Sequence, residues 1–342
     1  MTLADNSPLR SPIPLSDQPF FSVQIVNWNS GQYLHECLKA LDNQTFTDFV
    51  VRVLDNGSDQ LLPADIKETF AALNLTVMRS EKNLGFAGGN NLLARSSTSD
   101  YLVLLNADAF PEPDWLEKVH RACLEHPDHF FASRLVSASD PTILDGEWNV
   151  YHASGLAWRR NHNKPVTQST PLERRVFSAC AAAGVYPRPA FEAIGGFDED
   201  FFAYMEDLDL DFRLQLAGYP CLYLPNAVVR HVGAGSTSSR SGFMLRHGHR
   251  NLIWTFVKNM PGAFFWLLLP WHILANLIYF VLSFLLQNGS ELRRGKLEAM
   301  QGLAKVWRKR KQIQHNRKAS AWSIAKQLDW NPFSPLIKMS YK

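Results

Sequence analysis

The sequence predicts an α/β protein with a wound, mostly parallel sheet and a C-terminal helical appendage that associates with a membrane. Three observations carry this prediction. Between residues 20 and 110, apolar β-rich runs alternate with helix-like sequence, and residues 252 to 287 contain one charge, Lys258. Charge is also divided unevenly: 22 basic and 29 acidic residues precede residue 288, and 13 basic and 3 acidic residues follow.

Composition and length limit the possible classes. The chain has 342 residues, 46% of them hydrophobic, and a formal net charge of +3, which excludes a disordered or fibrous protein. The four cysteines form no CxxC pair and have no His at ligand spacing, so we expect neither a zinc site nor a disulfide framework and favour a reducing cytosol. We expect a flexible leader over residues 1–19, a main domain over residues 20–255, and apolar helices with a basic tail over residues 256–342.

The first part of the chain is expected to supply four buried strands. They are Phe20 to Asn27, Phe49 to Leu54, Leu75 to Arg79 and Tyr101 to Leu105, with crossover helices between them. In wound sheets, ligands bind beyond the carboxyl ends of the strands. Three of these ends continue as Asn27-Trp28-Asn29-Ser30, Asp55-Asn56-Gly57-Ser58 and Asn106-Ala107-Asp108. We therefore expect a polar binding site along this edge.

The middle of the chain is less regular. Residues 111 to 183 are mixed in pattern, and we assign no chemistry to them. A turn at Gly195-Gly196-Phe197 precedes an acidic helix that begins at Glu206 and is capped by Gly218. A short strand over Cys221 to Leu224 and another that ends at His231 are expected next, before a Gly/Ser-rich loop.

An apolar segment and a basic cluster end the chain. The uncharged run after Pro270, Trp271 to Gln287, would span about 25 Å as a helix, less than a bilayer core of ~30 Å. Its polar residues fall on one helical stripe: His272, Asn276, Ser283 and Gln287. This pattern favours an in-plane helix, or a re-entrant pair broken at Pro270. The basic cluster comprises Arg293, Arg294, Lys296, Lys305, Arg308, Lys309, Arg310, Lys311, Arg317 and Lys318. We expect it to meet an anionic membrane and not a nucleic acid.

Polar side chains at the predicted strand ends are candidates for ligand binding. Asp55 and Asn56 can bond a base or a ribose hydroxyl, although Asp-Asn-Gly-Ser is also an ordinary turn sequence. With diphosphate oxygens, Asp108 can hold Mg²⁺ or Mn²⁺, or it can instead cap a helix before Pro111. His231 is either a packing residue or a further metal ligand.

Two further segments are candidates. In Asn83 to Asn91, glycines would let backbone amides approach a phosphate or ribose, and a purely structural loop is the alternative. Its spacing differs from the dinucleotide and Walker loops. The pair Glu206-Asp207 follows the apolar segment Phe201 to Met205, so its carboxylates are expected to emerge from the core, where one can act as a general base. The alternative is a solvated helix face.

Taken in order, these segments resemble glycosyltransferase family 2, the inverting GT-A enzymes, and most closely its bacterial rhamnosyltransferase-like branch. The resemblance covers roughly residues 20 to 255. It implies transfer of a hexose from a nucleotide sugar to a lipid-linked or polysaccharide acceptor in cell-surface and cell-wall glycan synthesis. L-rhamnose from dTDP-rhamnose is the first expectation, with galactofuranose, glucose or mannose as alternatives.

The resemblance also implies residue roles. It implies Asp207 as the base with Glu206 beside it, and Asp108 and His231 as ligands of a divalent Mg or Mn ion. The implied nucleotide-sugar-binding residues are Asn27, Asn29, Asp55, Asn56, Asn83, Gly85, Phe86, Gly88, Asn90, Asn91 and Asn106, with Ser236, Arg240 and Arg250 in a lid over the diphosphate. Asn106 replaces the first acid of the DxD motif, which bears on the strength of metal dependence.

Two other functions remain open. The side of the membrane on which the protein lies is inferred separately, from where the donor is found. A nucleotidyltransferase would need a cation directly after the first strand, and Asn27 to Gly31 contains none. A degenerate, membrane-tethered glycan-binding protein has its best support in Asn106, while Asp55 and the pair Glu206-Asp207 count against it. Because nucleotide sugars are cytosolic and the tail is basic, we expect the protein on the cytoplasmic face of the membrane, with the apolar segment in-plane or re-entrant.

Overall fold

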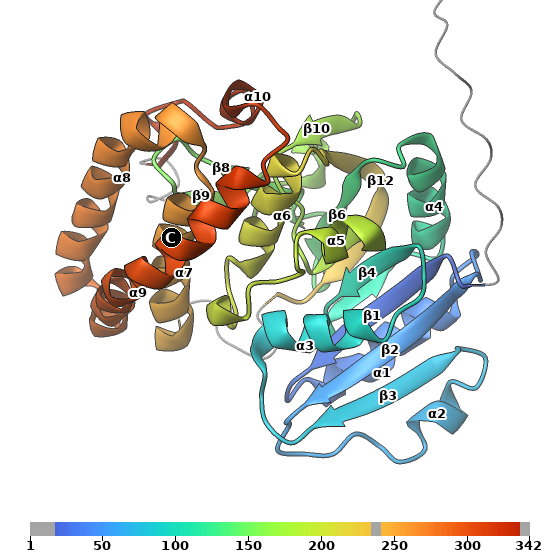
Figure 1. The fold of residues 1–342 in the computed structure, drawn as a ribbon. Helices are drawn as coiled ribbons and strands as arrows, with labels where there is room; N and C mark the ends of the chain where they lie inside the picture. Colours follow the sequence, from blue (N-terminus) through green and yellow to red (C-terminus); the bar gives the residue numbers. More distant parts are fainter. Residues whose placement is uncertain (1–17, 234–240, 336–342) are drawn as a thin grey trace, which may run out of the picture.

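The computed structural model describes residues 18–233 and 241–335 (Figure 1). The strands are β1 Phe21–Asn27, β2 Phe49–Asn56, β3 Leu75–Ser80, β4 Tyr101–Leu105, β5 Ala109–Pro111, β6 Phe130–Ser137, β7 Leu144–Gly146, β8 Asn149–Tyr151, β9 Ala157–Arg159, β10 Arg174–Val176, β11 Ala183–Pro187 and β12 Cys221–His231. The α-helices are α1 Gly31–Asp42, α2 Ile66–Thr69, α3 Gly85–Arg95, α4 Trp115–Glu125, α5 Arg188–Ala193, α6 Glu206–Leu216, α7 Gly242–Asn259, α8 Gly262–Leu282, α9 Gly289–His315 and α10 Ala321–Ala325.

A mixed sheet forms the centre of the molecule, with strand order β10-β12-β6-β11-β4-β1-β2-β3. Strands β1 to β4 run parallel, and β11 lies antiparallel between β4 and β6. β5 pairs with β12, β7 pairs with β6, and β8 and β9 form a separate hairpin. Helices α7, α8 and α9 lie together beside the sheet (Figure 1). The predicted α/β wound sheet with a C-terminal helical part is confirmed.

The first four strands lie where the apolar runs predict them. β4 has the predicted bounds, β1 begins one residue later, and β2 and β3 each run slightly further. Val23, Val51 and Val103 are fully buried, and each stabilises the fold by about 1.5 to 3 kcal/mol relative to an exposed position. Burial on both faces explains why these strands read as continuous apolar runs.

The segment Asn83 to Asn91 is not a loop, which corrects the expectation. Helix α3 begins at Gly85, and one of the glycines inside it, Gly89, packs against the sheet. A Cβ on Gly89 would lie 2.9 Å from the Val26 side chain. Helix α3 can therefore pack as close to β1 as it does only with a glycine at this position. Gly85 itself has a φ of +73°, where a Cβ would collide with the Phe202 carbonyl oxygen.

Strand β12 corrects a second expectation. The two short strands predicted around Leu224 and His231 form one strand, in which the register against β6 shifts between Leu224 and Val228. The polar interruption at Asn226 coincides with this bulge. The continuous strand carries His231 to the same edge as the ends of β1, β2 and β4.

The expected boundary at residues 255 and 256 falls inside helix α7, which runs unbroken over Gly242–Asn259. The apolar helix is also unbroken: α8 continues through Pro270, so a pair of helices split at that residue is wrong. A proline removes one helical hydrogen bond. Phe265, Leu268 and His272 pack α8 against the protein around this position and offset the loss.

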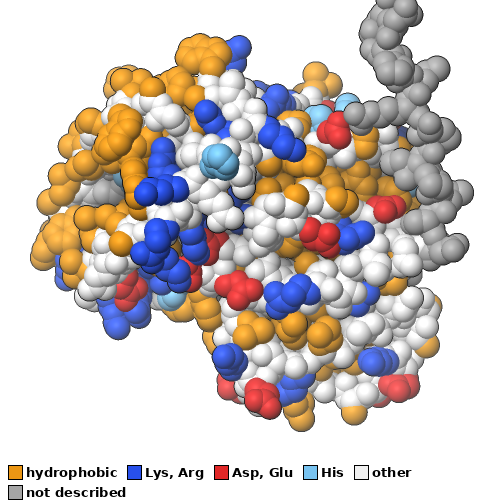
Figure 2. Space-filling view, in the orientation of Figure 1, with side chains coloured by type: hydrophobic (Ala, Val, Ile, Leu, Met, Phe, Trp, Pro, Cys, Tyr) orange, Lys and Arg blue, Asp and Glu red, His pale blue; other side chains and the backbone are white. Residues whose placement is uncertain are grey.

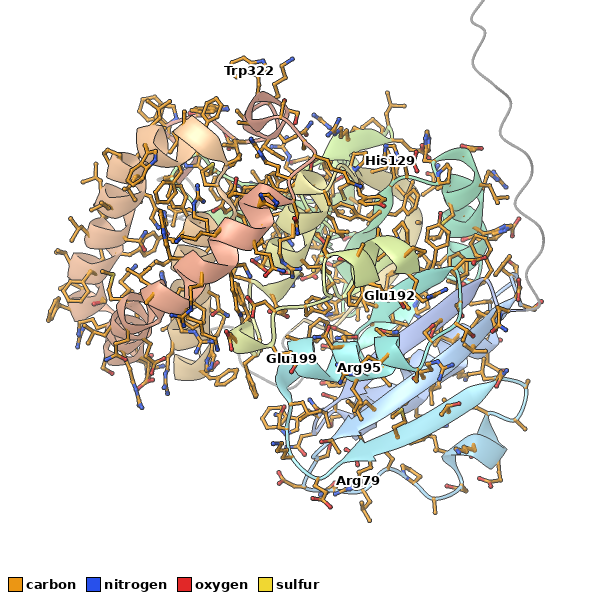
Figure 3. The ribbon with its side chains drawn as sticks, in the orientation of Figure 1. Arg79, Arg95, His129, Glu192, Glu199 and Trp322 are labelled. Carbon is orange, nitrogen blue, oxygen red and sulfur yellow. The ribbon has the colours of Figure 1, made fainter. Side chains whose placement is uncertain are left out.

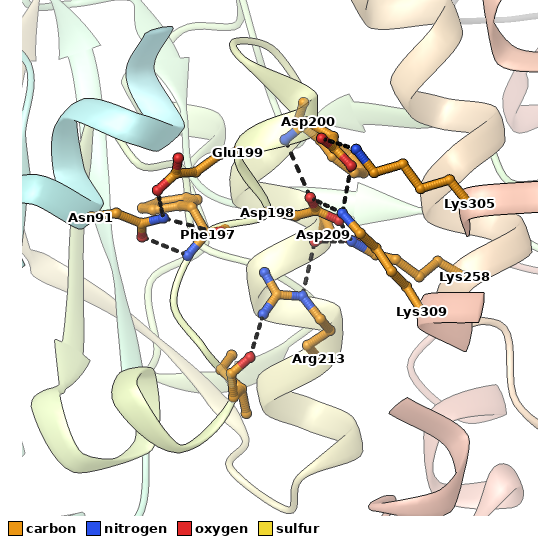
Figure 4. A network of polar contacts seen from close by, with 12 residues as sticks. Asn91, Phe197, Asp198, Glu199, Asp200, Asp209, Arg213, Lys258, Lys305 and Lys309 are labelled. Atoms are coloured by element: carbon orange, nitrogen blue, oxygen red, sulfur yellow. Dashed lines mark hydrogen bonds and ion pairs between the residues drawn. The ribbon is translucent and has the colours of Figure 1, made fainter. Parts of the chain in front are cut away.

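An ion-pair network joins the basic helix α9 to the sheet domain (Figure 4). Lys258 is 1% exposed, and its ammonium lies 2.6 Å from Asp198 and 2.8 Å from Asp209. Lys309 contacts Asp198 and Asp200, and Lys305 contacts Asp200 at 2.6 Å. Part of the basic cluster therefore binds the chain itself instead of facing a partner.

Lys258→Met is expected to lower the free energy of unfolding by about 3 to 5 kcal/mol, because Asp198 and Asp209 lose their shared buried cation. Lys305→Met is the matched control. It removes a 58% exposed member of the network and should cost at most about 1 kcal/mol. Urea unfolding of both variants measures the difference, and equally small losses would contradict the importance of Lys258.

Candidate functional site

The ends of β1 and β2 form the first part of the site. Asn27 is buried at the end of β1, and its Nδ2 lies 3.4 Å from the Ser58 hydroxyl. Asp55, at the end of β2, accepts hydrogen bonds from the Ser58 amide and from Arg79, which lies at the end of β3 (Figure 3). The exposed Asn29 also binds the turn, since its backbone amide donates to Ser58 at 3.0 Å. These contacts fix a polar rim at the sheet edge.

Asn56 holds the start of helix α3. Its amide nitrogen donates to Asn83 Oδ1 at 3.0 Å and to the Gly85 carbonyl at 3.1 Å, and its oxygen accepts from the Leu84 amide. Asn83 in turn accepts from the Gly85 amide at 2.8 Å. The structure therefore brings Asn56, Asn83 and Gly85 together as predicted, with the amide side chains engaged in shaping the edge.

The ends of β4 and β12 meet at the second part of the site. His231 Nε2 lies 3.3 Å from Asp108 Oδ1 and 3.3 Å from Asn106 Nδ2. On its other side, His231 Nδ1 contacts Asp145 Oδ2 at 2.8 Å. Asp145 also accepts from Arg159 Nη1 at 2.6 Å. The predicted residues Asn106, Asp108 and His231 are thus brought together, and Asp145 fixes the orientation of the imidazole.

Two carboxylates, those of Asp108 and Asp145, determine the electrostatics around His231. Burial disfavours the imidazolium form, but hydrogen bonds and charge from Asp108 and Asp145 outweigh it and raise the pKa of His231. With Nδ1 directed to Asp145, Nε2 is the ring atom that faces Asp108. A carboxylate and an imidazole nitrogen at one point are a donor set that fits a divalent cation, and the contact of Asp145 with Nδ1 holds the imidazole in this orientation.

No group of three or more His, Cys, Asp or Glu suited to a metal occurs among the residues that the structure describes. Within the part of the chain that the structure describes, the predicted ligands are therefore a pair, Asp108 and His231. Mg²⁺ usually takes one or two protein carboxylates and completes its shell with water and substrate phosphates. A pair of protein ligands is compatible with that mode of binding.

Helix α6 presents the acidic pair at the third part of the site. Asp207 Oδ2 lies 3.2 Å from Asn149 Nδ2 and 3.3 Å from the Ala181 amide, and Oδ1 accepts from the Leu208 amide. Burial raises the pKa of Asp207, and these hydrogen bonds oppose the shift. Glu206 is 8% exposed, burial raises its pKa strongly, and its Oε2 has no hydrogen-bond partner among the described residues.

Arg159 links the metal-binding candidates to the acidic pair. Its guanidinium interacts electrostatically with Asp108, Asp145 and Asp207. The backbone provides a second link, because the Asn106 amide donates to the Ala182 carbonyl at 3.1 Å, next to the Ala181 amide that binds Asp207. The second and third parts of the site therefore belong to one continuous polar surface.

Several predicted residues make contacts elsewhere. Asn90 bonds the Phe86 carbonyl one turn back in α3, and Asn91 binds Phe197 and Glu199 (Figure 4). Gly88 lies inside α3, with no phosphate-binding loop around it, and the Phe86 ring packs edge-on to Phe197 at 5.8 Å.

Arg250 is bound away from the predicted lid. Its guanidinium donates to the carbonyls of Asp200 and Phe201 and lies over the Trp254 ring. These contacts within the protein, and not the expected contact with a diphosphate, position Arg250. The other lid candidates, Ser236 and Arg240, lie outside the described residues.

Three residues of the site were missed because they come from the segment to which the sequence assigned no chemistry. Asn149 and Arg159 sit on the β8–β9 hairpin, and Asp145 sits on β7. The acidic turn Asp145-Gly146 was the only local signal, and it does not distinguish a site from an ordinary turn.

Comparison with known proteins identifies the family. The model for "Glycosyl transferase family 2" matches residues 22–195. N-acetylglucosaminyl-diphospho-decaprenol L-rhamnosyltransferase of Mycobacterium tuberculosis is 26% identical over 314 residues, which cover 82% of this chain and 97% of that protein.

Two solved structures show the same fold. One is the mannosyltransferase PcManGT of Pyrobaculum calidifontis with GDP-Man and Mn²⁺ (TM-score 0.52, 17% identity, 94% of this chain and 90% of that one). The other is GalNAc-T7 with UDP, GalNAc and Mn²⁺ (TM-score 0.52, 15% identity, 63% of this chain), of which this chain spans 43%. With the family model covering half of its length, and with this GT-A fold, the chain belongs to glycosyltransferase family 2.

Proposed function

We propose that the protein is an inverting, metal-dependent glycosyltransferase that moves L-rhamnose from dTDP-rhamnose to a hydroxyl of a lipid-linked acceptor in cell-surface glycan synthesis. The observation that carries this proposal is the order of functional groups along one sheet edge. Similarity to a rhamnosyltransferase that acts on a decaprenol-linked substrate supports the choice of sugar and acceptor.

The order of these groups matches the order of the parts of a nucleotide sugar. Asp55 on β2 would bind the nucleoside, Asp108 after β4 the diphosphate, and Asp207 would face the acceptor. β1 separates β2 from β4, so the two strands lie about 10 Å apart. That spacing suits a nucleoside bound at one strand end with its diphosphate at the other.

Asp207 is proposed to act as the general base. It would accept the proton of the acceptor hydroxyl, whose oxygen forms a bond to the anomeric carbon while the bond to the donor phosphate oxygen breaks on the opposite face. A single displacement of this kind inverts the anomeric centre. Asn149 and the Ala181 amide would orient the carboxylate, and burial, which raises the pKa of Glu206, would limit the competing charge beside it.

Asp108 and His231 would hold the divalent cation, and Asp145 would keep the imidazole nitrogen directed to it. When bound, the cation would neutralise charge on the departing nucleoside diphosphate. Arg159, between the two groups of carboxylates, would balance their charge when the donor is absent.

We also propose that the protein docks on the cytoplasmic face of the membrane through helix α8, which would lie in the membrane plane. In the described ranges, residues 262–285 form the one helix long and apolar enough to cross a bilayer. Its polar stripe faces the protein: His272 bonds the Ser154 carbonyl at 2.8 Å, and Asn276 accepts from Lys296 at 2.6 Å. These contacts favour a helix packed along the protein over one that leaves it to span.

The opposite side of α8 is apolar and exposed. Figure 2 shows hydrophobic side chains along the border formed by α8, with Lys and Arg gathered over α9. The exposed side chains are Trp266, Leu267, Ile273, Leu274, Leu277, Ile278, Val281, Phe284 and Leu285. Such a surface, flanked by cations, suits the interface of an anionic bilayer.

A panel of nucleotide sugars tests the proposed donor. Purified full-length protein in detergent should release nucleoside diphosphate from dTDP-rhamnose in the presence of Mg²⁺ or Mn²⁺, and the same donor should raise its melting temperature. Release from UDP-galactofuranose, UDP-glucose or GDP-mannose alone would move the assignment to that sugar. Binding without release from any donor, with acceptor lipid present, would favour a glycan-binding protein.

A further inference from the structure

A pocket at the start of helix α8 lies outside the proposed catalytic site. Its volume is about 510 Å³, and it lies between the first turn of α8 and the C-terminal part of α9. Trp266 of α8 and Trp307 of α9 contribute aromatic walls, and Arg310, Lys311 and Arg317 contribute cations. Of the described residues, none that lines the pocket is acidic. The pocket is therefore positively charged and partly aromatic.

The cations of this pocket differ in what they bind. Arg310 donates to the carbonyls of Val257 and Met260, so it belongs to the structural floor of the pocket. Within residues 18–233 and 241–335, neither Lys311 nor Arg317 takes part in an ion pair, and Arg317 Nη1 is buried without a hydrogen-bond partner. Burial, and to a smaller extent the charge of Arg317, lower the pKa of Arg310 to about 10.

The first turn of α8 adds hydrogen-bond donors. The helix begins at Gly262 after Pro261 with no side-chain cap, so its first amides lack partners within the helix, and the positive end of the helix dipole lies beside the pocket. A pocket that combines these amides, an unpartnered guanidinium group and a lysine has the chemistry of a phosphate-binding site.

The position of the pocket indicates where the phosphate comes from. Trp266 is 65% exposed, lies on the apolar side of α8 and approaches Trp307 at 6.4 Å between ring centroids. Trp322 projects outward from the neighbouring helix α10 (Figure 3). Tryptophans beside an apolar helix face are typical of residues at the headgroup level of a bilayer. The pocket thus lies where a docked membrane would present its headgroups.

We propose that this pocket binds the phosphate of an anionic phospholipid headgroup and so sets the depth and rotation of α8 in the membrane plane. The inference rests on the proposed docking through α8 and is independent of the sugar transferred. It differs from general attraction of a basic tail, because Lys311 and Arg317 would act by position and not only by charge.

Matched double variants test the proposal with full-length protein. Lys311→Ala with Arg317→Ala removes two pocket cations, and Arg308→Ala with Lys318→Ala removes two exposed cations from outside it. Binding to vesicles of phosphatidylglycerol and phosphatidylcholine is measured by co-sedimentation. Loss of charge near the surface weakens binding roughly five-fold per residue, and we expect the pocket pair to lose at least about ten-fold more than the control pair.

The outcomes separate this inference from the proposed enzyme activity. Equal losses in the two pairs would overturn the pocket and leave membrane docking in place. Vesicles of pure phosphatidylcholine are the lipid control, and wild-type binding to them as tight as to the phosphatidylglycerol mixture would also overturn it. Binding of inorganic phosphate that needs Lys311 and Arg317, without any effect of these residues on vesicles, would assign the pocket to a soluble phosphate. Nucleoside diphosphate release in detergent and the melting temperature should match the wild type in both pairs, and a loss there would mark a folding defect.

Discussion

Asp207→Asn is expected to lower turnover by at least about 100-fold while the donor still binds, because an amide cannot accept the acceptor proton. The substitution keeps the shape of the side chain. Because the Leu208 amide binds Oδ1 and the Ala181 amide binds Oδ2, the single amide oxygen of asparagine keeps one of these two contacts. Single-turnover rates report the chemical step, and a thermal-shift titration with the nucleoside diphosphate reports donor binding. Near-normal turnover would overturn the assignment of the base.

The neighbouring acids give matched controls. Asp209 is fully buried and bound to Lys258 and Arg213, so Asp209→Asn should reduce stability and leave the rate per folded molecule near the wild-type value. Burial raises the pKa of Glu206, so Glu206→Gln removes a carboxyl group whose charged form is disfavoured at this position and should have a small effect on turnover. If Glu206→Gln lost activity and Asp207→Asn did not, the base would be Glu206.

The pH dependence of turnover gives a second measure of the same residue. Burial raises the pKa of Asp207 above the ordinary value of 3.8. A base must be ionised, so turnover should fall as the pH drops through this raised pKa, and the acid limb should lie above the range of an exposed aspartate. A profile of kcat against pH measures the limb. If the acid limb stayed unchanged in Asp207→Asn, the limb would belong to another group.

The fold could be predicted where the sequence pattern depends on local burial. Val23, Val51 and Val103 lie in strands buried on both faces, and such strands read directly as apolar runs. A crossover helix is expected between β3 and β4, but the start of α3 at Gly85 could not be predicted, because glycine and asparagine are poor helix formers. Its glycines are fixed by packing instead: a side chain at Gly89 would collide with Val26 across the helix–sheet interface.

The same limit applies to the candidate site: the residues at strand ends follow from the strand pattern, and the others do not. Asp55, Asp108 and His231 follow strands, and parallel strands bring their ends to one edge, so their proximity follows from the strand pattern. Asp145 reaches His231 across 86 residues of sequence, and its partner Arg159 comes from a short hairpin. No local periodicity reports a contact of that kind.

The basic tail illustrates the same limit. Its composition predicts attraction to an anionic surface, but charge counts do not tell which cations are already bound. Lys305 and Lys309 bind Asp200, and Lys296 is buried against Asn276. The cations left for a membrane are therefore fewer than the composition implies, which is why their positions matter.

Asp108→Ala is the second substitution with a large expected effect. It removes one of the two protein ligands proposed for the divalent cation, which is itself proposed to neutralise the departing diphosphate. Charge stabilisation of this kind contributes several kcal/mol, so turnover should fall by at least about 100-fold and saturating Mn²⁺ should restore only part of it. Nucleoside diphosphate release measured across a Mn²⁺ titration, with chelator as the zero point, tests this expectation.

Asp145→Asn is the matched variant for Asp108→Ala, and a weaker loss of metal affinity is expected from it. Asp145 touches His231 Nδ1 and not the position where the cation would bind, so this variant should weaken apparent metal affinity by about 10- to 100-fold and recover at high Mn²⁺. If high Mn²⁺ restored the turnover of Asp145→Asn but not that of Asp108→Ala, Asp145 would be a positioning residue and Asp108 a ligand. If both variants kept wild-type Mn²⁺ dependence, the cation would bind elsewhere along the edge, and Asn106 in place of the first acid of the DxD motif would then mark a lost metal site.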